Sequence, residues 1–354
     1  MTILADSHSH GREPWLAVFG LGGTVASAAG ADGGAVPSRE IGELLEDSGC
    51  IPPGVRVVGT QFRMVASSEL TLADIVELSN AIRDAQTAGA RGVVVAQGTD
   101  TIEETAFALD VLLHDVTIPV VVTGAMRHPS LPGSDAAANL AAALDVATST
   151  AAKNHRVLVV INDEIHTALF VRKAHTTSPS AFSSWPVGAV GWVSERRVHL
   201  PLALHIPAVT LSVASSLQIP SVALVSVGLG DDGETLRSVA TRSVAGCVVE
   251  AMGGGHVPSA LVADLGDLAS RLPVVISSRT GAGAVLESTY GFAGSETDVL
   301  ARGVISAGFL TTSKARVFLQ LLLAAGLSRS EISHHFASLL RVTQTHTEQQ
   351  EGTP

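Results

Sequence analysis

Two kinds of apolar pattern alternate along the first half of the chain. Short runs of consecutive apolar residues are typical of strands buried on both faces, and they occur at Trp15–Phe19, Gly92–Ala96, Pro119–Thr123 and Arg156–Ile161. Ala-rich or amphipathic stretches with helical spacing separate these runs, at Leu72–Ala88, Thr101–Leu113 and Ser134–Thr148. This alternation predicts an α/β fold, with a larger N-terminal domain whose mostly parallel sheet is covered by helices on both faces.

A segment without helical periodicity separates this part of the chain from the rest. It contains Pro201, Pro207 and Pro220, and we place a linker there. Beyond it, further apolar runs predict strands of a smaller C-terminal α/β domain and one strongly apolar helix: Val222–Val227, Gly246–Glu250, Pro273–Ser277 and the helix Lys314–Ala325. The expected organisation is an N-terminal domain over 13–205, a linker over 206–219, a C-terminal domain over 220–343 and a tail over 344–354.

The composition argues against several classes of protein. The 354 residues carry a formal net charge of -11 at pH 7, which disfavours a nucleic-acid or anionic-membrane surface. No apolar run is long enough to cross a bilayer, and the start of the sequence lacks the basic and apolar regions of a signal peptide. We therefore expect a cytoplasmic protein with no nucleic-acid or membrane partner.

Cysteine and histidine spacing gives no sign of a metal site. Cys50 and Cys247 form no C-x-x-C pair, and we expect both to be buried as small apolar residues, with one bridge between them left open. His8 and His10 lack a third ligand, so we interpret them as part of a tail. We expect neither a metal nor an organic cofactor.

A glycine-rich turn follows the first predicted strand and contains a hydroxyl residue. In the segment GLGGTVAS, from Gly20 to Ser27, glycines let the backbone turn tightly and approach a ligand. Gly20, Gly22 and Ala26 also fit the dinucleotide pattern G-x-G-x-x-A, which requires a helix directly afterwards. The chain continues instead as a loop-like stretch over 28–34, and we therefore favour a turn that presents Thr24 over a dinucleotide site.

Two further polar segments follow predicted strands. In QGTDTIEE, from Gln97 to Glu104, a capping box of Thr101 and Glu104 would begin the next helix, but one cap does not account for Thr99 and Asp100. The segment NDEI leads to VRKAHTT, which contains a lysine near threonines. Lysines in loops are usually solvated, whereas a desolvated Lys173 can lose its proton and act as a base. Ligands of open parallel sheets bind beyond the carboxyl ends of the strands, so the three segments predict a site there.

These three segments together resemble the bacterial-type L-asparaginases, which carry GGT, GTDT-EE and ND–K–TT blocks in this order. Further blocks match over nearly the whole chain: Val122–Arg127, Ser134–Leu140, Phe182, Val275–Arg279, Gly308–Leu310 and Lys314–Arg316. The resemblance implies a two-domain amidohydrolase that releases ammonia from L-asparagine through a threonine acyl-enzyme. It also implies a homodimer or homotetramer whose sites lie at the interface of an intimate dimer.

The resemblance gives each matching residue a role. Thr24 is the nucleophile, and Thr99 relays its proton to a neutral Lys173. Asp100 pairs with the α-ammonium of the substrate, and Ser67 holds its α-carboxylate. Backbone N–H groups near Gly98 and Thr99 stabilise the oxyanion. Residues expected to contact the substrate are Gly23, Ser67, Ser68, Gly98, Thr99, Asp100 and Ala125.

The sequence departs from the family pattern at several positions. Typical members carry a tyrosine on the loop after GGT, but the only tyrosine here is Tyr290, close to Glu287. Tyr290 either completes the site of a neighbouring subunit, and so joins the catalytic residues, or packs in the subunit interface. Gln97 replaces a histidine, Glu164 replaces a threonine, and the family's GNG block reads GGGH, ending at His256. These changes concern recognition of the α-amino end more than the acyl chemistry.

Rival functions keep the same fold. One is a glutaminase, or the amide-donating step of a tRNA amidotransferase, although the sequence shows no basic surface for tRNA. The other is a non-catalytic amino-acid binding protein. The complete set of Thr24, Thr99, Asp100 and Lys173 argues against a binding protein, because binding alone requires neither a nucleophile nor its base.

Overall fold

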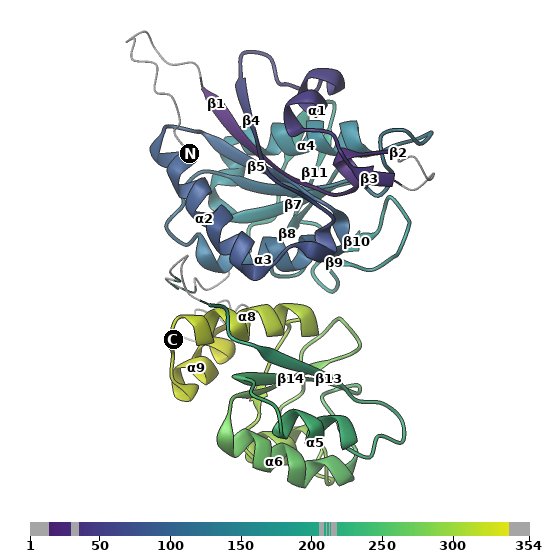
Figure 1. The fold of residues 1–354 in the computed structure, drawn as a ribbon, viewed down its shortest axis with the longest axis vertical. Coiled ribbons are helices and arrows are strands. Elements are labelled where there is room, and N and C mark those ends of the chain that lie inside the picture. Colours follow the sequence, from purple (N-terminus) through teal and green to yellow (C-terminus); the bar gives the residue numbers. More distant parts are fainter. Residues whose placement is uncertain are drawn as a thin grey trace, which may run out of the picture.

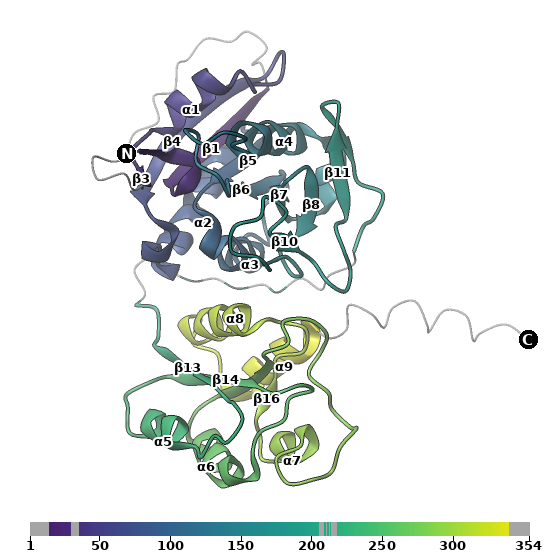
Figure 2. The ribbon, with the colours of Figure 1, turned by 90° about the vertical axis from the view of Figure 1, so that its right-hand side faces the viewer.

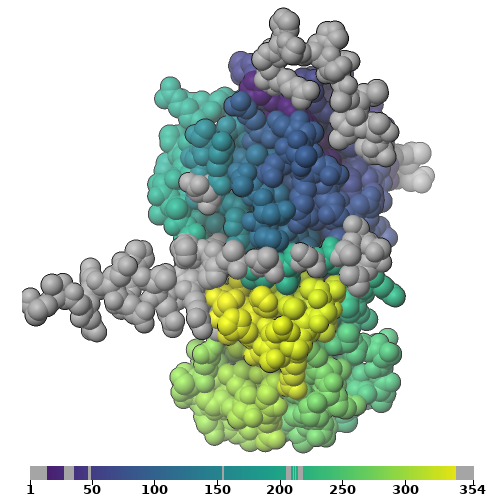
Figure 3. Space-filling model, turned by 90° about the vertical axis from the view of Figure 1, so that its left-hand side faces the viewer, coloured from purple at the N-terminus to yellow at the C-terminus, as the bar shows by residue number. Residues whose placement is uncertain are grey.

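The computed structural model describes residues 14–29, 35–204, 209, 211, 213 and 218–339. Two sheets lie one above the other along the long axis of the molecule, the N-terminal half above and the C-terminal half below (Figure 1). Helices α8 (Thr312–Ala324) and α9 (Arg329–Leu339) lie between the two sheets (Figures 1 and 2). The space-filling view shows the same layer, coloured yellow, between the blue and green parts of the molecule (Figure 3).

The larger sheet has eight strands in the order β12-β11-β8-β7-β6-β5-β1-β4. Its five parallel strands are β1 (Trp15–Gly22), β4 (Arg56–Val65), β5 (Gly92–Ala96), β6 (Val120–Thr123) and β7 (Val157–Ile161). Three antiparallel strands extend one edge, β8 (Glu164–Thr167), β11 (Gly191–Ser194) and β12 (Arg197–His199). This sheet has a parallel core and helices on both faces, which confirms the predicted α/β class.

Side chains of each central strand alternate between two cores. Val93 and Val95 of β5 pack with helices α2 (Leu72–Thr87) and α3 (Ile102–Leu112), whereas Val94 packs on the opposite face. That opposite face is covered by α1 (Ile41–Ser48) and α4 (Ala136–Thr148). Such two-sided burial explains why these strands read as continuous apolar runs.

The smaller sheet is wholly parallel and has the order β13-β14-β15-β16. Its strands are β13 (Val222–Ser226), β14 (Gly246–Ala251), β15 (Val274–Ser278) and β16 (Ile305–Ser306). One face packs on α5 (Glu234–Ala240), α6 (Val262–Arg271) and α7 (Glu296–Ala301). The other packs on α8 and α9, and α8 in turn contacts α3, with the rings of Phe107 and Phe318 5.8 Å apart. One apolar core therefore runs through both halves.

The predicted strands and helices are all present with small changes of bounds, but several elements were not predicted. The sequence of β4 mixes apolar and polar residues, and its side chains are mostly half-buried at the edge of the sheet. Short strands also flank the stretch expected to be loop-like, because β2 (Ser27–Ala29) pairs with β3 (Ala35–Pro37). Two more short strands, β9 (Arg172–Lys173) and β10 (Phe182–Ser183), form a separate hairpin.

Other expectations concern single residues. Cys50 and Cys247 are both buried, as expected, and they form no disulfide with each other. Burial raises the pKa of the Cys247 thiol to about 12. In the part of the chain that the structure describes, no helix is long and apolar enough to cross a membrane. His8, His10, the tail and most of the proposed linker lie outside the described residues.

Candidate active site

The candidate site lies at the carboxyl ends of three adjacent strands, β5, β1 and β4. The turn after β1 holds Thr24, the segment after β4 holds Ser67, and the turn after β5 holds Thr99 and Asp100. Because β1 pairs with both of its neighbours in parallel, these three turns start at the same end of the sheet, where the carboxyl ends of the strands lie. The strand order thus brings together residues that are far apart in the sequence.

Glycines allow the three turns to touch. Gly23 has a φ of +77°, and a Cβ added to it would lie 2.1 Å from the backbone nitrogen of Gly98. A Cβ on Gly98 would lie 2.8 Å from Oγ of Ser67. Thr24 follows Gly23 at the start of a short 3-10 turn and is half-buried. Thr24, Ser67 and Thr99 are therefore carried by turns in direct contact.

The lysine predicted to act as a base is joined to the second turn. Nζ of Lys173 donates to Oγ1 of Thr99 at 2.8 Å and to Oδ1 of Asp100 at 2.5 Å. Thr99 is buried, the Lys173 side chain is 16% exposed, and the Asp100 side chain is 70% exposed. The Thr99 hydroxyl is thus held inside the site by the amine of Lys173, while the Asp100 carboxylate is exposed to solvent.

A hollow of about 520 Å³ opens above this cluster. Its lining consists of Asp100, Lys173, Ala174, His175 and Thr176. His175 shapes this wall, because its Nδ1 accepts the backbone N–H groups of Thr177 and Ser178 at 3.1 and 3.0 Å. The hollow gives a small ligand direct access to the carboxylate and the amine.

The predicted capping box of Thr101 and Glu104 is wrong. Thr101 is the residue before α3, but its side chain makes no capping bond. Its hydroxyl donates instead to the carbonyl oxygen of Ser67 at 3.1 Å and accepts from Nε2 of Gln97 at 3.3 Å. A 3-10 turn over Thr99–Thr101 precedes the helix and directs this hydroxyl toward the Ser67 segment. Thr101 therefore joins two turns of the site.

Glu104 is partly buried below the site rather than free at a helix end. Burial and the neighbouring Glu103 raise the pKa of Glu104 to about 7. Its Oε2 atom is buried and accepts no hydrogen bond from any of the described residues. A carboxyl group in such surroundings stays protonated far closer to neutral pH than an exposed one.

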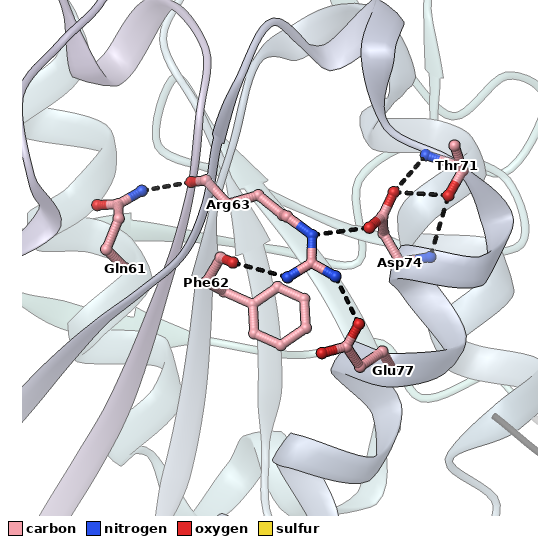
Figure 4. A network of polar contacts seen from close by, with 6 residues as sticks. All are labelled: Gln61, Phe62, Arg63, Thr71, Asp74 and Glu77. Atoms are coloured by element: carbon pink, nitrogen blue, oxygen red, sulfur yellow. Dashed lines mark hydrogen bonds and ion pairs between the residues drawn. The ribbon is translucent and has the colours of Figure 1, made fainter. Parts of the chain in front are cut away.

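The segment that carries Ser67 and Ser68 is fastened at both ends. Nε of Arg63, near the end of β4, donates to Oδ1 of Asp74 in the first turn of α2 at 2.7 Å (Figure 4). Asp74 and Thr71 form a capping box at the start of this helix (Figure 4). Ser67 is buried and Ser68 is exposed. The ion pair closes a short loop whose middle lies against Gly98.

A fourth turn, after β6, packs behind Thr99. Gly124 leaves room there, since a Cβ on it would lie 3.2 Å from Cγ2 of Thr99. Nδ2 of Asn139 donates to the carbonyl oxygen of Gly124 at 2.9 Å, and Asp135 accepts the N–H of Met126. Ala125 is fully buried behind this turn, so its contact with a substrate stays a prediction.

Tyr290 lies in the C-terminal half, between β15 and α7. Within its own chain its ring contacts are with His256 and Phe292, at centroid distances of 5.1 and 5.9 Å. The Tyr290 residue is 46% exposed, and its backbone N–H donates to Oε1 of the buried Glu296 at 2.7 Å. The ring is therefore exposed on the surface beside His256. That Tyr290 completes the active site of a neighbouring subunit stays a prediction.

Gln97 and Glu164, two further departures from the family pattern, do not line the hollow. Gln97 is fully buried and turned toward Gly98 and Thr101. Glu164 is exposed on β8, with its carboxylate 3.4 Å from His166. Among the described residues, no group of three or more His, Cys, Asp and Glu side chains is placed to hold a metal ion.

Sequence reasoning missed the contacts of one carboxylate. Glu103 was expected only to favour the start of a helix, but its Oε2 accepts the backbone N–H of Lys173 at 2.8 Å. The two residues are far apart in the chain, and no local pattern pairs them. The topology alone brings the start of α3 beside β9.

Known proteins match the chain over both halves. The family model "Asparaginase, N-terminal" matches residues 15–204, and "Glutaminase/Asparaginase C-terminal domain" matches residues 221–336. An L-asparaginase of Bacillus licheniformis is 32% identical over 317 residues, covering 88% of this chain and 95% of that protein. A probable L-asparaginase of Deinococcus radiodurans is 34% identical over 330 residues, covering 91% of this chain and 97% of that protein.

A solved structure agrees as well. The crystal structure of a probable cytoplasmic L-asparaginase from Campylobacter jejuni matches with a TM-score of 0.82 and 29% identity. The match covers 92% of this chain and 99% of that one. With two family models that together span most of its length, the chain belongs to the asparaginase family.

Proposed function

We propose that this protein hydrolyses L-asparagine to L-aspartate and ammonia through an acyl-enzyme formed on Thr24. The observation that carries the proposal is the 2.8 Å hydrogen bond from Lys173 Nζ to Thr99 Oγ1, on a turn packed against Gly23. A threonine hydroxyl is a weak nucleophile at neutral pH and needs a base within reach. The contact between the two turns supports a route for the proton from Thr24 through Thr99 to Lys173.

The reaction is proposed to run in two halves. In the first, the Thr24 oxygen bonds to the side-chain amide carbon, and Thr99 takes up the hydroxyl proton while passing its own to neutral Lys173. For this step Nζ of Lys173 accepts from the Thr99 hydroxyl rather than donating to it. The C–N bond then breaks, and the amide nitrogen leaves as ammonia after taking up that proton. In the second, a water oxygen bonds to the ester carbon and the bond from that carbon to the Thr24 oxygen breaks. A proton of the water passes to the Thr24 oxygen, which restores its hydroxyl and releases L-aspartate. Backbone N–H groups near Gly98 and Thr99 stabilise each oxyanion, by about 3–4 kcal/mol.

Recognition of the substrate is assigned to the outer part of the site. The exposed Asp100 carboxylate pairs with the α-ammonium, and Ser67 binds the α-carboxylate, with Gly23, Ser68 and the buried Ala125 as further contacts. Asp100 borders the hollow, which supports its role, and Ser67 touches the Gly98 turn. Neither a metal nor an organic cofactor enters the scheme.

The proposal extends to the organisation and assembly of the protein. The family matches support domains over 13–205 and 220–343, joined by a linker over 206–219. We propose a homodimer or homotetramer in which the exposed Tyr290 reaches the site of a neighbouring subunit. A cytoplasmic location is supported by the solved relative, which is described as a probable cytoplasmic L-asparaginase.

Asparagine is favoured over glutamine because the relatives named above are L-asparaginases. An ammonia-release assay with both amides tests this preference. The Thr24→Ala variant should release no ammonia, stay folded, and still bind L-aspartate. L-Aspartate at 100 times its Kd would add about 2.7 kcal/mol to the free energy of unfolding, which a thermal shift detects. Substantial turnover by Thr24→Ala would show that another residue is the nucleophile.

A further inference from the structure

Lys314 is a fully buried lysine outside the reaction scheme. It lies in the first turn of α8, in the C-terminal half. Its Nζ donates to the backbone carbonyl oxygens of Ala168, Leu169 and Val171 at 2.8, 2.9 and 2.5 Å. An ammonium group has three N–H donors, so the set of contacts is complete. These carbonyls belong to the segment 168–171, which leads directly into Lys173.

A second link runs from the adjacent residue on the same helix. Oγ of Ser313 donates to Oε1 of Glu103 at 2.7 Å, and the other oxygen of this carboxylate accepts the backbone N–H of Lys173 at 2.8 Å. Glu103 thus links the start of α8 to the backbone of Lys173, the proposed base. The backbone of Lys173 is held by this link and the segment before it by Lys314.

Two further contacts tie the same segment to the C-terminal half. The rings of Phe170 and Phe309 meet edge to face, with centroids 6.2 Å apart. The guanidinium of Arg172 packs on Gly281, where an added Cβ would lie 1.6 Å from Nη1 of the arginine. Residues 168–172 therefore contact the C-terminal half at each position, and Lys173 follows them directly.

The chemistry of Lys314 is not that of a residue that only packs. Burial lowers the pKa of Lys314 to about 8, opposed by the carboxylates of Glu103, Glu104 and Asp110. Apolar contacts such as Phe107 with Phe318 already hold the two halves together, without any desolvation of a charge. Three hydrogen bonds to successive carbonyls are directional, so they fix a backbone conformation where apolar contacts do not.

The sequence marks the same residue. Lysine occurs only at positions 153, 173 and 314, although the chain has 22 basic residues. Arginine is therefore the usual basic residue of this protein. A lysine in the buried face of an apolar helix is the exception, and its compact ammonium fits three converging carbonyls where a planar guanidinium does not.

We propose that Lys314, with Ser313 and Glu103, is a positioning residue for Lys173, so that the C-terminal half sets the geometry of the base in its own chain's site. This inference rests on the proposed function, in which Lys173 receives the proton of the nucleophile. Lys314 touches no reacting atom in this scheme. It acts by holding the backbone from which the Lys173 side chain reaches Thr99.

The test compares Lys314→Met and Ser313→Ala with Gln320→Met as a matched control. Gln320 lies on the same helix and its Nε2 donates to the carbonyl of Pro220 at 3.2 Å, but not to segment 168–173. Ser313→Ala removes one hydrogen bond to Glu103 and keeps the buried ammonium, so it tests the link if Lys314→Met does not fold. The measurements are kcat and KM for L-asparagine, the free energy of unfolding, and hydrogen exchange of the amides of 168–173.

We expect kcat to fall at least about tenfold in Lys314→Met, because small misplacements of a catalytic group are costly. Ser313→Ala should show a smaller loss of kcat, KM should change little in both, and amides of 168–173 should exchange faster. Gln320→Met should keep the kcat of the unmodified protein and its exchange in this segment. Folded variants with unchanged kcat and exchange would overturn the inference, as would equal losses in Gln320→Met at equal stability. If the unmodified protein hydrolyses no amide, the proposed function fails, and unchanged exchange in the variants would separately refute the positioning role.

Discussion

Gly23 and Gly98 touch backbone to backbone, and this contact joins the turn of Thr24 to the turn of Thr99. A side chain on Gly23 would place its Cβ 2.1 Å from the Gly98 nitrogen and would also have to adopt a φ of +77°. We therefore expect Gly23→Ala to separate the two turns and to lower kcat/KM at least about a hundredfold. Ammonia release, measured beside the circular dichroism of the folded protein, checks this.

Gly42 offers a matched control for that substitution. It lies in α1 with an ordinary φ, is exposed, and a Cβ added to it would meet nothing within 4 Å. Gly42→Ala should keep full activity and raise the free energy of unfolding by about 0.5–1 kcal/mol. Equal activity in Gly23→Ala and Gly42→Ala would mean that the contact between the two turns has no catalytic role.

Lys173→Met should lower kcat by several orders of magnitude and change the affinity for L-aspartate much less. Loss of a base acts on the transition state rather than on binding of the ground state. The control is Lys153, an exposed lysine in the 3-10 turn Thr150–Asn154 that follows α4. Lys153→Met should be fully active. Steady-state kinetics measure the loss of kcat, and a binding titration measures the affinity for L-aspartate. A normal kcat in Lys173→Met would show that Lys173 is not the base.

Tyr290→Phe should reduce kcat/KM at least about tenfold, or 1.4 kcal/mol, if the phenol completes a neighbour's site. The substitution keeps the ring, and hence its contacts with His256 and Phe292, and removes only the hydroxyl. A packing role predicts the opposite, with nearly normal kinetics in Tyr290→Phe and a cost only in Tyr290→Ala.

Co-expression of two inactive variants tests whether the neighbour is involved. If Tyr290 serves the adjacent subunit, mixed oligomers of Thr24→Ala and Tyr290→Ala chains should recover part of the activity. Such oligomers contain sites with an intact Thr24 on one chain and an intact Tyr290 on the other. Full activity of Tyr290→Phe would assign the acid–base work to Lys173 and Thr99 alone.

The ion pair of Arg63 and Asp74 predicts a pH dependence of stability. Burial raises the pKa of Asp74, but hydrogen bonds from Thr71 and the contact with Arg63 outweigh it and leave the pKa below its ordinary value of 3.8. The carboxylate therefore stabilises the fold above that value, and this contribution is lost as the pH falls through the lower folded pKa. Asp74→Asn should cost about 1 kcal/mol near neutral pH, since the pair is partly exposed.

Urea unfolding at several pH values measures this contribution. The difference between the unmodified protein and Asp74→Asn should shrink steadily below about pH 4, where the unfolded carboxylate takes up its proton. A difference that is independent of pH would show that the ionised form of Asp74 is not what stabilises the loop.

The sequence predicts what is local in this fold and misses what is distant. Strands such as Gly92–Ala96 are buried on both faces, so their apolar runs are unambiguous, whereas the edge strand β4 is half-buried and mixes polar with apolar residues. The resemblance placed Lys173 beside Thr99 and Asp100, and the structure confirms these contacts. A capping pattern suggested the wrong partner for Thr101, because the competing carbonyl of Ser67 lies in the 3-10 turn after β4, far from Thr101 in the chain. Nothing near Glu103 in the chain points to its bond with the backbone of Lys173.

The turns that carry Thr24, Ser67 and Thr99 leave the sheet at the carboxyl ends of its parallel strands, and β4 begins at the opposite end of the sheet. There, residues 53 and 54 lie exposed before the first residue of β4. An affinity tag, a dye or a tether to a solid support can be joined to this turn without entering the site. Attachment at the exposed Pro53 would leave the turns of Thr24, Ser67 and Thr99 at the end of the sheet that faces away from the support.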